Sequence, residues 1–229
     1  MSLENTISAF GPLAAKDPRL FFATQAAKRN LGKIEDAKVG LEDFISTAPT
    51  GPWKQNALAE LWIMERRGNP PKNVYTCKFT DFKPILDGKL NDECWKSAQA
   101  VKLVDWSGLS AKENYTEFKT LYDSEFLYVS AICTSKIPNI VKNKVSPTRD
   151  LSLKSKDQIF FQIDLDRDYT TCYQFQIDSL GNVIDDCWGD LSWNPKWFFS
   201  TENTETGWTF EAAIPMGMIS SSPATSGKS

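Results

Sequence analysis

Histidine is absent from the 229 residues of this chain. Without an imidazole, the protein cannot use Ser-His-Asp or Cys-His catalysis, an HExxH zinc site or a facial-triad iron centre. Glycoside hydrolysis remains open because it needs only a pair of carboxylates, and so does the binding of oxygen-ligand metals such as calcium. The absence therefore excludes the commonest catalytic sites, whereas sites built from Asp and Glu remain possible.

Several other signals are also missing. The five cysteines include no CxxC pair, which argues against a thiolate zinc site or a thioredoxin-like motif. No apolar run approaches the ~18 residues that span a bilayer, and Met1–Thr6 has neither the basic nor the apolar region of a signal peptide. Lys and Arg number 26 against 29 Asp and Glu, without the basic excess typical of nucleic-acid binding. We therefore expect no membrane span and no nucleic-acid partner.

The first third of the chain has the periodicity of helices. Between Asp17 and Arg67, apolar side chains recur at three- and four-residue spacing in three short segments. Gly32 suits the end of the first helix and Pro52 the first turn of the third, and a Pro-Pro pair then breaks the pattern. Residues 1–73 are predicted to form a short helical hairpin or part of a helical repeat.

After the Pro-Pro pair the pattern changes to that of strands. Apolar and polar residues alternate in segments separated by polar turns: Tyr115–Asp123, Phe126–Cys133, Gln158–Asp164, Thr171–Asp178 and Gly207–Ile214. Such segments predict an antiparallel β-sandwich over residues 74–217. The low-complexity tail, residues 218–229, is predicted to be disordered. The expected fold class is α+β.

The order of the strand motifs resembles that of family 9 carbohydrate-binding modules. The resemblance rests on ILDGKLNDECW, LYDSEFLYV, KDQIFFQID, YQFQID and GWTFEAAIP, which occur in the family's order over residues 84–215. It implies a jelly-roll-like β-sandwich that binds the ends of sugar chains, such as those of xylan or cellulose. It also implies a noncatalytic module of a larger protein associated with glycoside hydrolases, with a secreted or cell-envelope location.

The resemblance does not carry over the family's sugar contacts. The family's tryptophan, glutamate and arginine contacts fall on Lys154, Phe160 and Gln176, and a second tryptophan belongs to strands that follow the last motif. Gln176 is retained as a candidate contact. We expect that the final strands are missing from this chain or are supplied by another chain through self-association.

A tryptophan-rich segment offers another candidate sugar site. Trp188, Trp193 and Trp197 lie among Asp and Asn residues, and indole faces pack on sugar rings while carboxylates and amides bind hydroxyl groups. Trp193 and Trp197 are the better ligand candidates. The alternative, which is favoured, is that these rings cover the end of the sandwich.

Clustered carboxylates offer a candidate calcium site. Asp164, Asp166 and Asp168 alternate in one turn, and Asp185 lies in the next hairpin. Calcium takes six to eight oxygen ligands, which such carboxylates can provide. The alternative is that hairpin turns are ordinarily rich in Asp.

The leading hypothesis is a noncatalytic module that binds an oligo- or polysaccharide and requires no cofactor. A second hypothesis is a structural or protein-interaction module whose sugar site has been lost. The residues at the family contact positions, Lys154, Phe160 and Gln176, favour this second hypothesis. A carboxylate-based glycosidase is a distant third, because no catalytic motif is visible.

Overall fold

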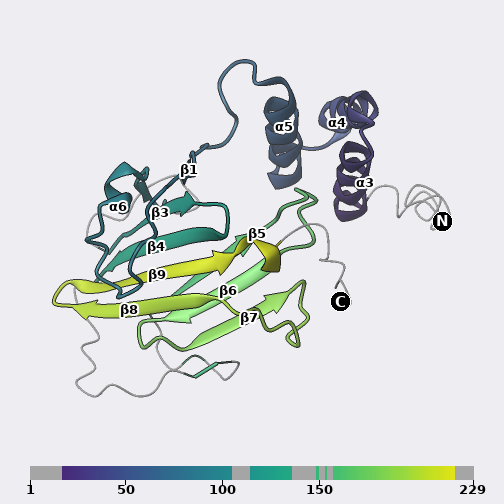
Figure 1. Ribbon diagram of the computed structural model, residues 1–229. Helices are drawn as coiled ribbons and strands as arrows, with labels where there is room; N and C mark the ends of the chain where they lie inside the picture. The colour runs from purple at the N-terminus through teal and green to yellow at the C-terminus, as the bar shows by residue number, and fades with distance from the viewer. Residues whose placement is uncertain (1–16, 105–113, 136–147, 150–152, 154–156, 220–229) are drawn as a thin grey trace. The chain divides into compact units, whose positions relative to one another are not determined.

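The computed structural model describes residues 17–104, 114–135, 148–149, 153 and 157–219 (Figure 1). The chain divides into two compact units, one of Met1–Val74 with Asp164–Cys172 and one of Tyr75–Ile163 with Tyr173–Ser229. The first unit is helical and the second is built from β-sheets, which confirms the predicted α+β class. Among the described residues, no helix has both the length and the apolar character needed to cross a bilayer.

Helices of the first unit lie where the periodicity predicts them. Their bounds are Pro18–Asn30 for α3, Ile34–Thr47 for α4 and Pro52–Glu65 for α5. The Asp17 carboxylate accepts the backbone N–H of Arg19 and so caps α3, and Gly32 follows this helix with a φ of 75°. The buried side chains of Phe22, Leu41 and Ala57 join the helices in one small core.

The segment Asp164–Cys172 belongs to the helical unit and contacts a buried carboxylate of α5. Glu60 is fully buried. Its Oε2 lies 3.4 Å from Nη1 of Arg29 and accepts a 3.0 Å hydrogen bond from Nε of Arg167, while its Oε1 accepts one of 3.1 Å from the hydroxyl of Tyr169. The sequence predicts a polar turn with a candidate calcium site here. The structure instead gives this segment a place in the packing of the helices.

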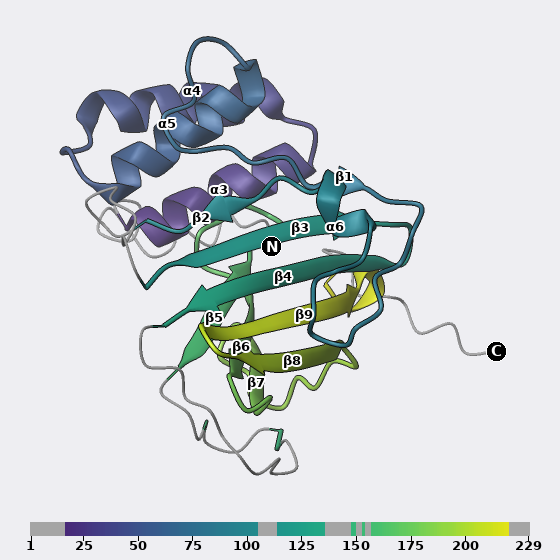
Figure 2. The ribbon, with the colours of Figure 1, turned by 90° about the vertical axis from the view of Figure 1, so that its left-hand side faces the viewer.

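The larger sheet of the second unit, here called sheet A, has the strand order β1-β3-β4-β9-β8, with β2 paired to β3 (Figure 2). All pairs are antiparallel except β1 with β3. The bounds are Lys78–Phe79 for β1, Val101–Lys102 for β2, Thr116–Tyr122 for β3, Phe126–Thr134 for β4, Phe198–Thr204 for β8 and Gly207–Pro215 for β9.

The smaller sheet, here called sheet B, consists of three antiparallel strands in chain order. They are β5 (Gln158–Ile163), β6 (Tyr173–Asp178) and β7 (Val183–Cys187). Val129 and Phe210 of sheet A belong to the same hydrophobic cluster as Phe175 and Ile177 of sheet B. The two sheets therefore face each other across a shared core, which is the predicted sandwich.

The outer face of sheet A is covered by the segment that contains α6 (Cys94–Ser97). Trp95 of this short helix is buried against Leu121 of β3 and Tyr128 of β4.

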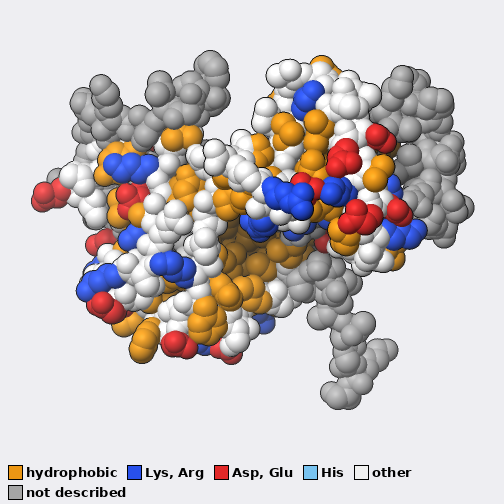
Figure 3. All heavy atoms as spheres, turned by 90° about the horizontal axis from the view of Figure 1, so that it is seen from above, with side chains coloured by type: hydrophobic (Ala, Val, Ile, Leu, Met, Phe, Trp, Pro, Cys, Tyr) orange, Lys and Arg blue, Asp and Glu red, His pale blue; other side chains and the backbone are white. Residues whose placement is uncertain are grey.

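On the face of the molecule seen in Figure 3, Lys and Arg side chains are interspersed with Asp and Glu.

The chain beyond β9 differs in part from the predicted disordered tail. A 3-10 turn, η1 (Met216–Met218), follows the strand, and Ile219 is buried in the core of the sandwich. The sandwich therefore extends beyond its predicted end at residue 217. The rest of the tail lies outside the described residues.

Candidate functional site

The outer face of sheet B, which points away from the shared core, carries the candidate site. In β5 the apolar side chains of Ile159, Phe161 and Ile163 pack on the core, so the residues between them lie on the outer face. β5 is paired with β6 and β6 with β7, so the outer face continues across all three strands. Its members are Gln158, Phe160 and Gln162 of β5, Gln174, Gln176 and Asp178 of β6, and Ile184 and Asp186 of β7.

The strand register places these side chains in rows. Phe160, Gln176 and Ile184 lie directly opposite one another, and Gln162 and its partners Gln174 and Asp186 form the next row. Because neighbouring strands lie about 4.8 Å apart, each row spans about 10 Å. The outer face is therefore an extended surface.

Phe160 is the aromatic centre of this outer face. Its side chain is 50% exposed, and glutamines flank it along β5 and across to β6. A phenyl ring packs on apolar ligand surfaces, and each glutamine amide can both donate and accept hydrogen bonds. The face thus suits an uncharged ligand that combines flat apolar surfaces with many hydroxyl groups.

The carboxylates on the outer face are already engaged. Asp178 is fully buried and accepts the backbone N–H groups of Leu180 and Asn182 (3.0 and 2.9 Å). Asp186 is 7% exposed, and its Oδ1 accepts the N–H of Gly189 (2.8 Å). Both act as caps of adjacent turns.

Residues 85–228 match the model of the carbohydrate family 9 binding domain-like family. The chain belongs to this family. The family 9 resemblance that the strand motifs predict is therefore confirmed.

Solved structures of other family 9 modules were also found. One, from Caldicellulosiruptor kristjanssonii in complex with cellotriose, is 18% identical with a TM-score of 0.46, and the match covers 63% of this chain and 67% of that one. A second, from the same organism in complex with glucose, is 16% identical with a TM-score of 0.38 and coverages of 60% and 67%. None of the curated proteins with which the chain was compared matches it.

Within this family 9 module, the outer face of sheet B includes two of the positions at which the resemblance places sugar contacts. Phe160 and Gln176 are paired directly across β5 and β6. Lys154, the third position, lies outside the described residues. The sequence analysis did not identify Gln158, Gln162 and Gln174 as neighbours of these two residues. The alternation of residues in β5 and β6 places all five on the same face of the sheet and could have indicated it.

Trp188 lies at the exposed end of β7. Its side chain is 69% exposed, and its backbone φ is 55°. With Gly189, whose φ is 79°, it forms a two-residue turn between the paired residues Cys187 and Asp190. Of the three candidate tryptophans, this one offers the most exposed ring.

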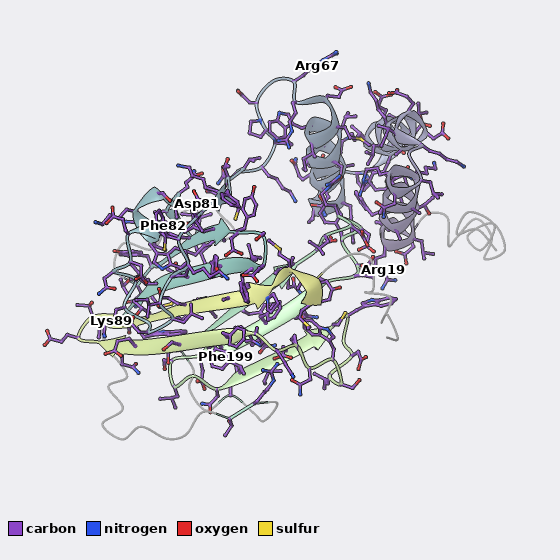
Figure 4. The ribbon with its side chains drawn as sticks, in the orientation of Figure 1. Arg19, Arg67, Asp81, Phe82, Lys89 and Phe199 are labelled. Atoms are coloured by element: carbon purple, nitrogen blue, oxygen red, sulfur yellow. The ribbon has the colours of Figure 1, made fainter. Side chains whose placement is uncertain are left out.

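Trp197 belongs to the hydrophobic core of the sandwich. It is only 4% exposed, and its Nε1 donates a 3.0 Å hydrogen bond to Oδ2 of the buried Asp185. Its neighbour Phe199, labelled in Figure 4, lies with its ring 4.7 Å from the indole. Trp197 is therefore a core residue, which agrees with the favoured alternative, and its ring does not lie on the surface.

Trp193 is half-buried rather than free on the surface. Its ring lies 5.0 Å from that of Tyr173 and 5.7 Å from that of Phe175. These contacts attach it to the core, in agreement with the alternative that the tryptophans cover the end of the sandwich.

The four acidic residues predicted to bind calcium serve other partners. Asp164 accepts the N–H of Tyr169, and burial raises the pKa of its carboxyl group. The Asp168 carboxylate accepts N–H groups of the following turn, and the Asp166 carboxylate accepts a 3.4 Å hydrogen bond from Nδ2 of Asn30. The Asp185 carboxylate binds the Arg149 guanidinium and the Trp197 indole. No group of three or more potential metal ligands occurs among the described residues. Calcium binding stays a prediction.

Proposed function

We propose that this family 9 module binds a neutral glycan on the outer face of sheet B. The observation that carries the proposal is the half-exposed ring of Phe160 among the amides of Gln158, Gln162 and Gln176. Sugar rings present apolar C–H faces to an aromatic ring, and their hydroxyl groups exchange hydrogen bonds with amides. Asp178 and Asp186, the carboxylates of this face, are buried and cap turns, which supports binding without bond cleavage.

The glycan class that fits best is a plant-type polysaccharide such as xylan or cellulose. Family membership supports this choice, and so does the neutral character of the outer face, because the backbones of these polysaccharides carry hydroxyl groups and no charge. In this proposal the module serves a larger polysaccharide-degrading protein at the cell envelope or outside the cell.

One observation favours a second function. Phe160 stands where the resemblance places the family's glutamate, so the same face could instead bind an apolar surface of another protein. The two functions differ in a simple way: only the first requires affinity for soluble oligosaccharides.

Isothermal titration with xylohexaose and cellohexaose, with calcium in the buffer, tests the proposal. We expect binding by the unchanged protein and a loss of at least about tenfold in Phe160→Ala, because burial of a phenyl side chain is worth about 1.5–3 kcal/mol. Phe198→Ala is the matched control, since Phe198 is 54% exposed on sheet A. The absence of binding at millimolar sugar by folded protein would favour the protein-interaction function.

A further inference from the structure

β5 is an edge strand of sheet B that lacks the features by which sheet edges are ordinarily protected. Charged residues, prolines and very short strands keep an edge from pairing with another chain. In the described part of the two sheets, each of the other edge strands carries a charged residue: Lys78 in β1, Lys102 in β2, Asp185 and Asp186 in β7, and Glu202 in β8. β5 has the sequence QIFFQI, with neither a charge nor a proline. Its edge therefore favours pairing with a further strand.

The backbone of β5 directs hydrogen-bonding groups away from β6. The carbonyl of Asp157 accepts the N–H of Ser179 (2.9 Å), so these two residues form a hydrogen-bonded pair of the ladder. Hydrogen-bonded and non-hydrogen-bonded pairs alternate in an antiparallel ladder, so the N–H and C=O groups of Gln158, Phe160 and Gln162 point to the open side. No described residue forms a hydrogen bond to these backbone groups. Each of the three residues thus offers one donor and one acceptor.

The apolar core of the sandwich is also incompletely covered along β5. Ile159 and Phe161 face the core but are only partly buried, whereas Phe175 in the neighbouring β6 is fully buried. A cavity of about 160 Å³ lies between the sheets at this place, and its lining includes these two residues of β5 together with Phe118 and Ala131 of sheet A. A further strand beside β5 would place alternate side chains against this opening.

We propose that β5 pairs with β5 of a second copy of this chain, so that two copies of sheet B form one continuous antiparallel sheet. The strand is complementary to itself. In the register that uses all three outward-directed residues, Phe160 lies opposite Phe160 of the second copy and Gln158 lies opposite Gln162. On the core side, Ile159 lies opposite Phe161. This pairing brings no charged residues of β5 together, because the strand contains none.

The pairing goes beyond the proposed function and does not rest on it. Paired residues of neighbouring strands stand on the same face of a sheet, so Phe160 stays on the outer face when the two copies pair. A strand of 6 residues is shorter than a standard interface requires, since that buries about 800 Å² on each partner. We therefore expect a dimer that dissociates at micromolar concentrations.

Sedimentation equilibrium of the full chain, in reducing buffer and without sugar, tests this pairing. We expect the unchanged protein to dimerise with rising concentration between about 1 and 300 µM. Gln158→Lys combined with Gln162→Lys places lysines opposite each other and should weaken the dimer at least about tenfold. Gln158→Lys combined with Gln162→Glu places opposite charges there, so this variant should dimerise at least as tightly as the unchanged protein.

A mixture of two variants supplies the matched control for folding. Gln158→Glu combined with Gln162→Glu should be as weak a dimer as the lysine variant. An equimolar mixture of the two should form heterodimers, because each lysine then lies opposite a glutamate. Thermal unfolding of each variant by itself confirms that both are folded before they are mixed.

Phe160→Cys tests the register directly. Hydrogen-bonded pairs of an antiparallel sheet have Cα atoms about 5.5 Å apart, which suits a disulfide. After oxidation this variant should give a covalent dimer on a non-reducing gel, well above the background from the five native cysteines. Gln176→Cys is the control, since Gln176 lies opposite Phe160 on β6 and one strand further from the edge. It should give no more covalent dimer than the unchanged protein.

Three results would overturn the inference. A protein that stays monomeric at the highest concentration would show that the edge of β5 is covered by another segment of the polypeptide or by a different partner. A dimer that the two lysines leave unchanged would lie on another surface. Equal cross-linking of Phe160→Cys and Gln176→Cys would exclude this register. Because no sugar is present, none of these results bears on the proposed function.

Discussion

Glu211 is the single residue that does most to join the covering segment to sheet A. It is fully buried in β9, and its carboxylate accepts hydrogen bonds from Nε1 of Trp95 (2.7 Å) and from the N–H groups of Asp87 (3.1 Å) and Gly88 (2.9 Å). Gly88 adopts a φ of 86°, and a Cβ atom there would lie 2.9 Å from the backbone of β8. The Asp-Gly turn and the tryptophan of ILDGKLNDECW therefore both donate hydrogen bonds to the glutamate of GWTFEAAIP.

Glu211→Gln should destabilise the protein although it preserves the shape of the side chain. Both carboxylate oxygens accept N–H groups, so the amide nitrogen of glutamine must face a donor. We expect a loss of about 1–3 kcal/mol in the free energy of unfolding, measured by urea titration. Glu205→Gln, in an exposed turn, should change it by less than about 0.5 kcal/mol. Equal effects of the two substitutions would contradict this role of Glu211.

Asp123 gives the hairpin of β3 and β4 a dependence on pH. Burial acts to raise the pKa of its carboxyl group, but hydrogen bonds from the Tyr128 hydroxyl and from the N–H groups of Glu125 and Phe126 together lower it below its ordinary value of 3.8. A lowered pKa contributes stability that is present above the unfolded-state pKa and is lost as the pH falls through the folded-state pKa.

The advantage of the unchanged protein over Asp123→Asn should therefore be constant near neutral pH and shrink below the ordinary pKa of 3.8. Urea unfolding at a series of pH values measures this difference. An advantage that is independent of pH down to the acid transition would show that the Asp123 carboxylate is not the group responsible.

At the scale of elements, the buried network around Glu60 should control the stability of the helical unit. Glu60→Ala leaves the Arg29 guanidinium, whose side chain is 7% exposed, without its carboxylate. Removing one partner of a buried pair costs about 3–5 kcal/mol. Glu65→Ala in the same helix breaks a more exposed ion pair with Lys38 and should cost less than about 1 kcal/mol.

Limited proteolysis and thermal unfolding compare these two α5 variants. The fragments that appear first in Glu60→Ala should come from residues 17–74. Similar unfolding of both variants would contradict the assigned role of the network.

Elements with a local signal could be predicted from the sequence, and contacts between distant residues could not. Periodicity and alternation locate α3 to α5 and β3 to β6 to within about two residues. The membership of residues 164–172 in the helical unit depends on Arg167 and Tyr169 meeting Glu60, more than a hundred residues earlier. No pattern along the chain reveals such a pairing.

The candidate site also combines residues that the sequence could predict with contacts that it could not. Gln176 and Phe160 could be singled out by resemblance, whereas their position opposite each other depends on the register of β5 and β6. Trp197 and Trp188 have similar sequence surroundings, but Asp185 holds the first indole in the core while the turn exposes the second. Only the packing distinguishes them.

At the scale of the whole molecule, binding to the outer face of sheet B should be insensitive to salt. The net charge of the chain is −3, but the exposed members of this face are uncharged, and a neutral glycan adds no charge. We expect the affinity to change by less than about twofold between low salt and ionic strengths near 1 M, where charges are screened within about 3 Å. A steep fall with salt, measured by the same titration, would indicate a charged ligand.

The titration of xylohexaose and cellohexaose into the unchanged protein, Phe160→Ala and Phe198→Ala tests the central claim most directly. The account predicts binding of at least one hexaose by the unchanged protein and by Phe198→Ala, and a loss of at least about tenfold in Phe160→Ala. Equal affinities of all three proteins would contradict it, because the sugar would then bind away from the outer face of sheet B.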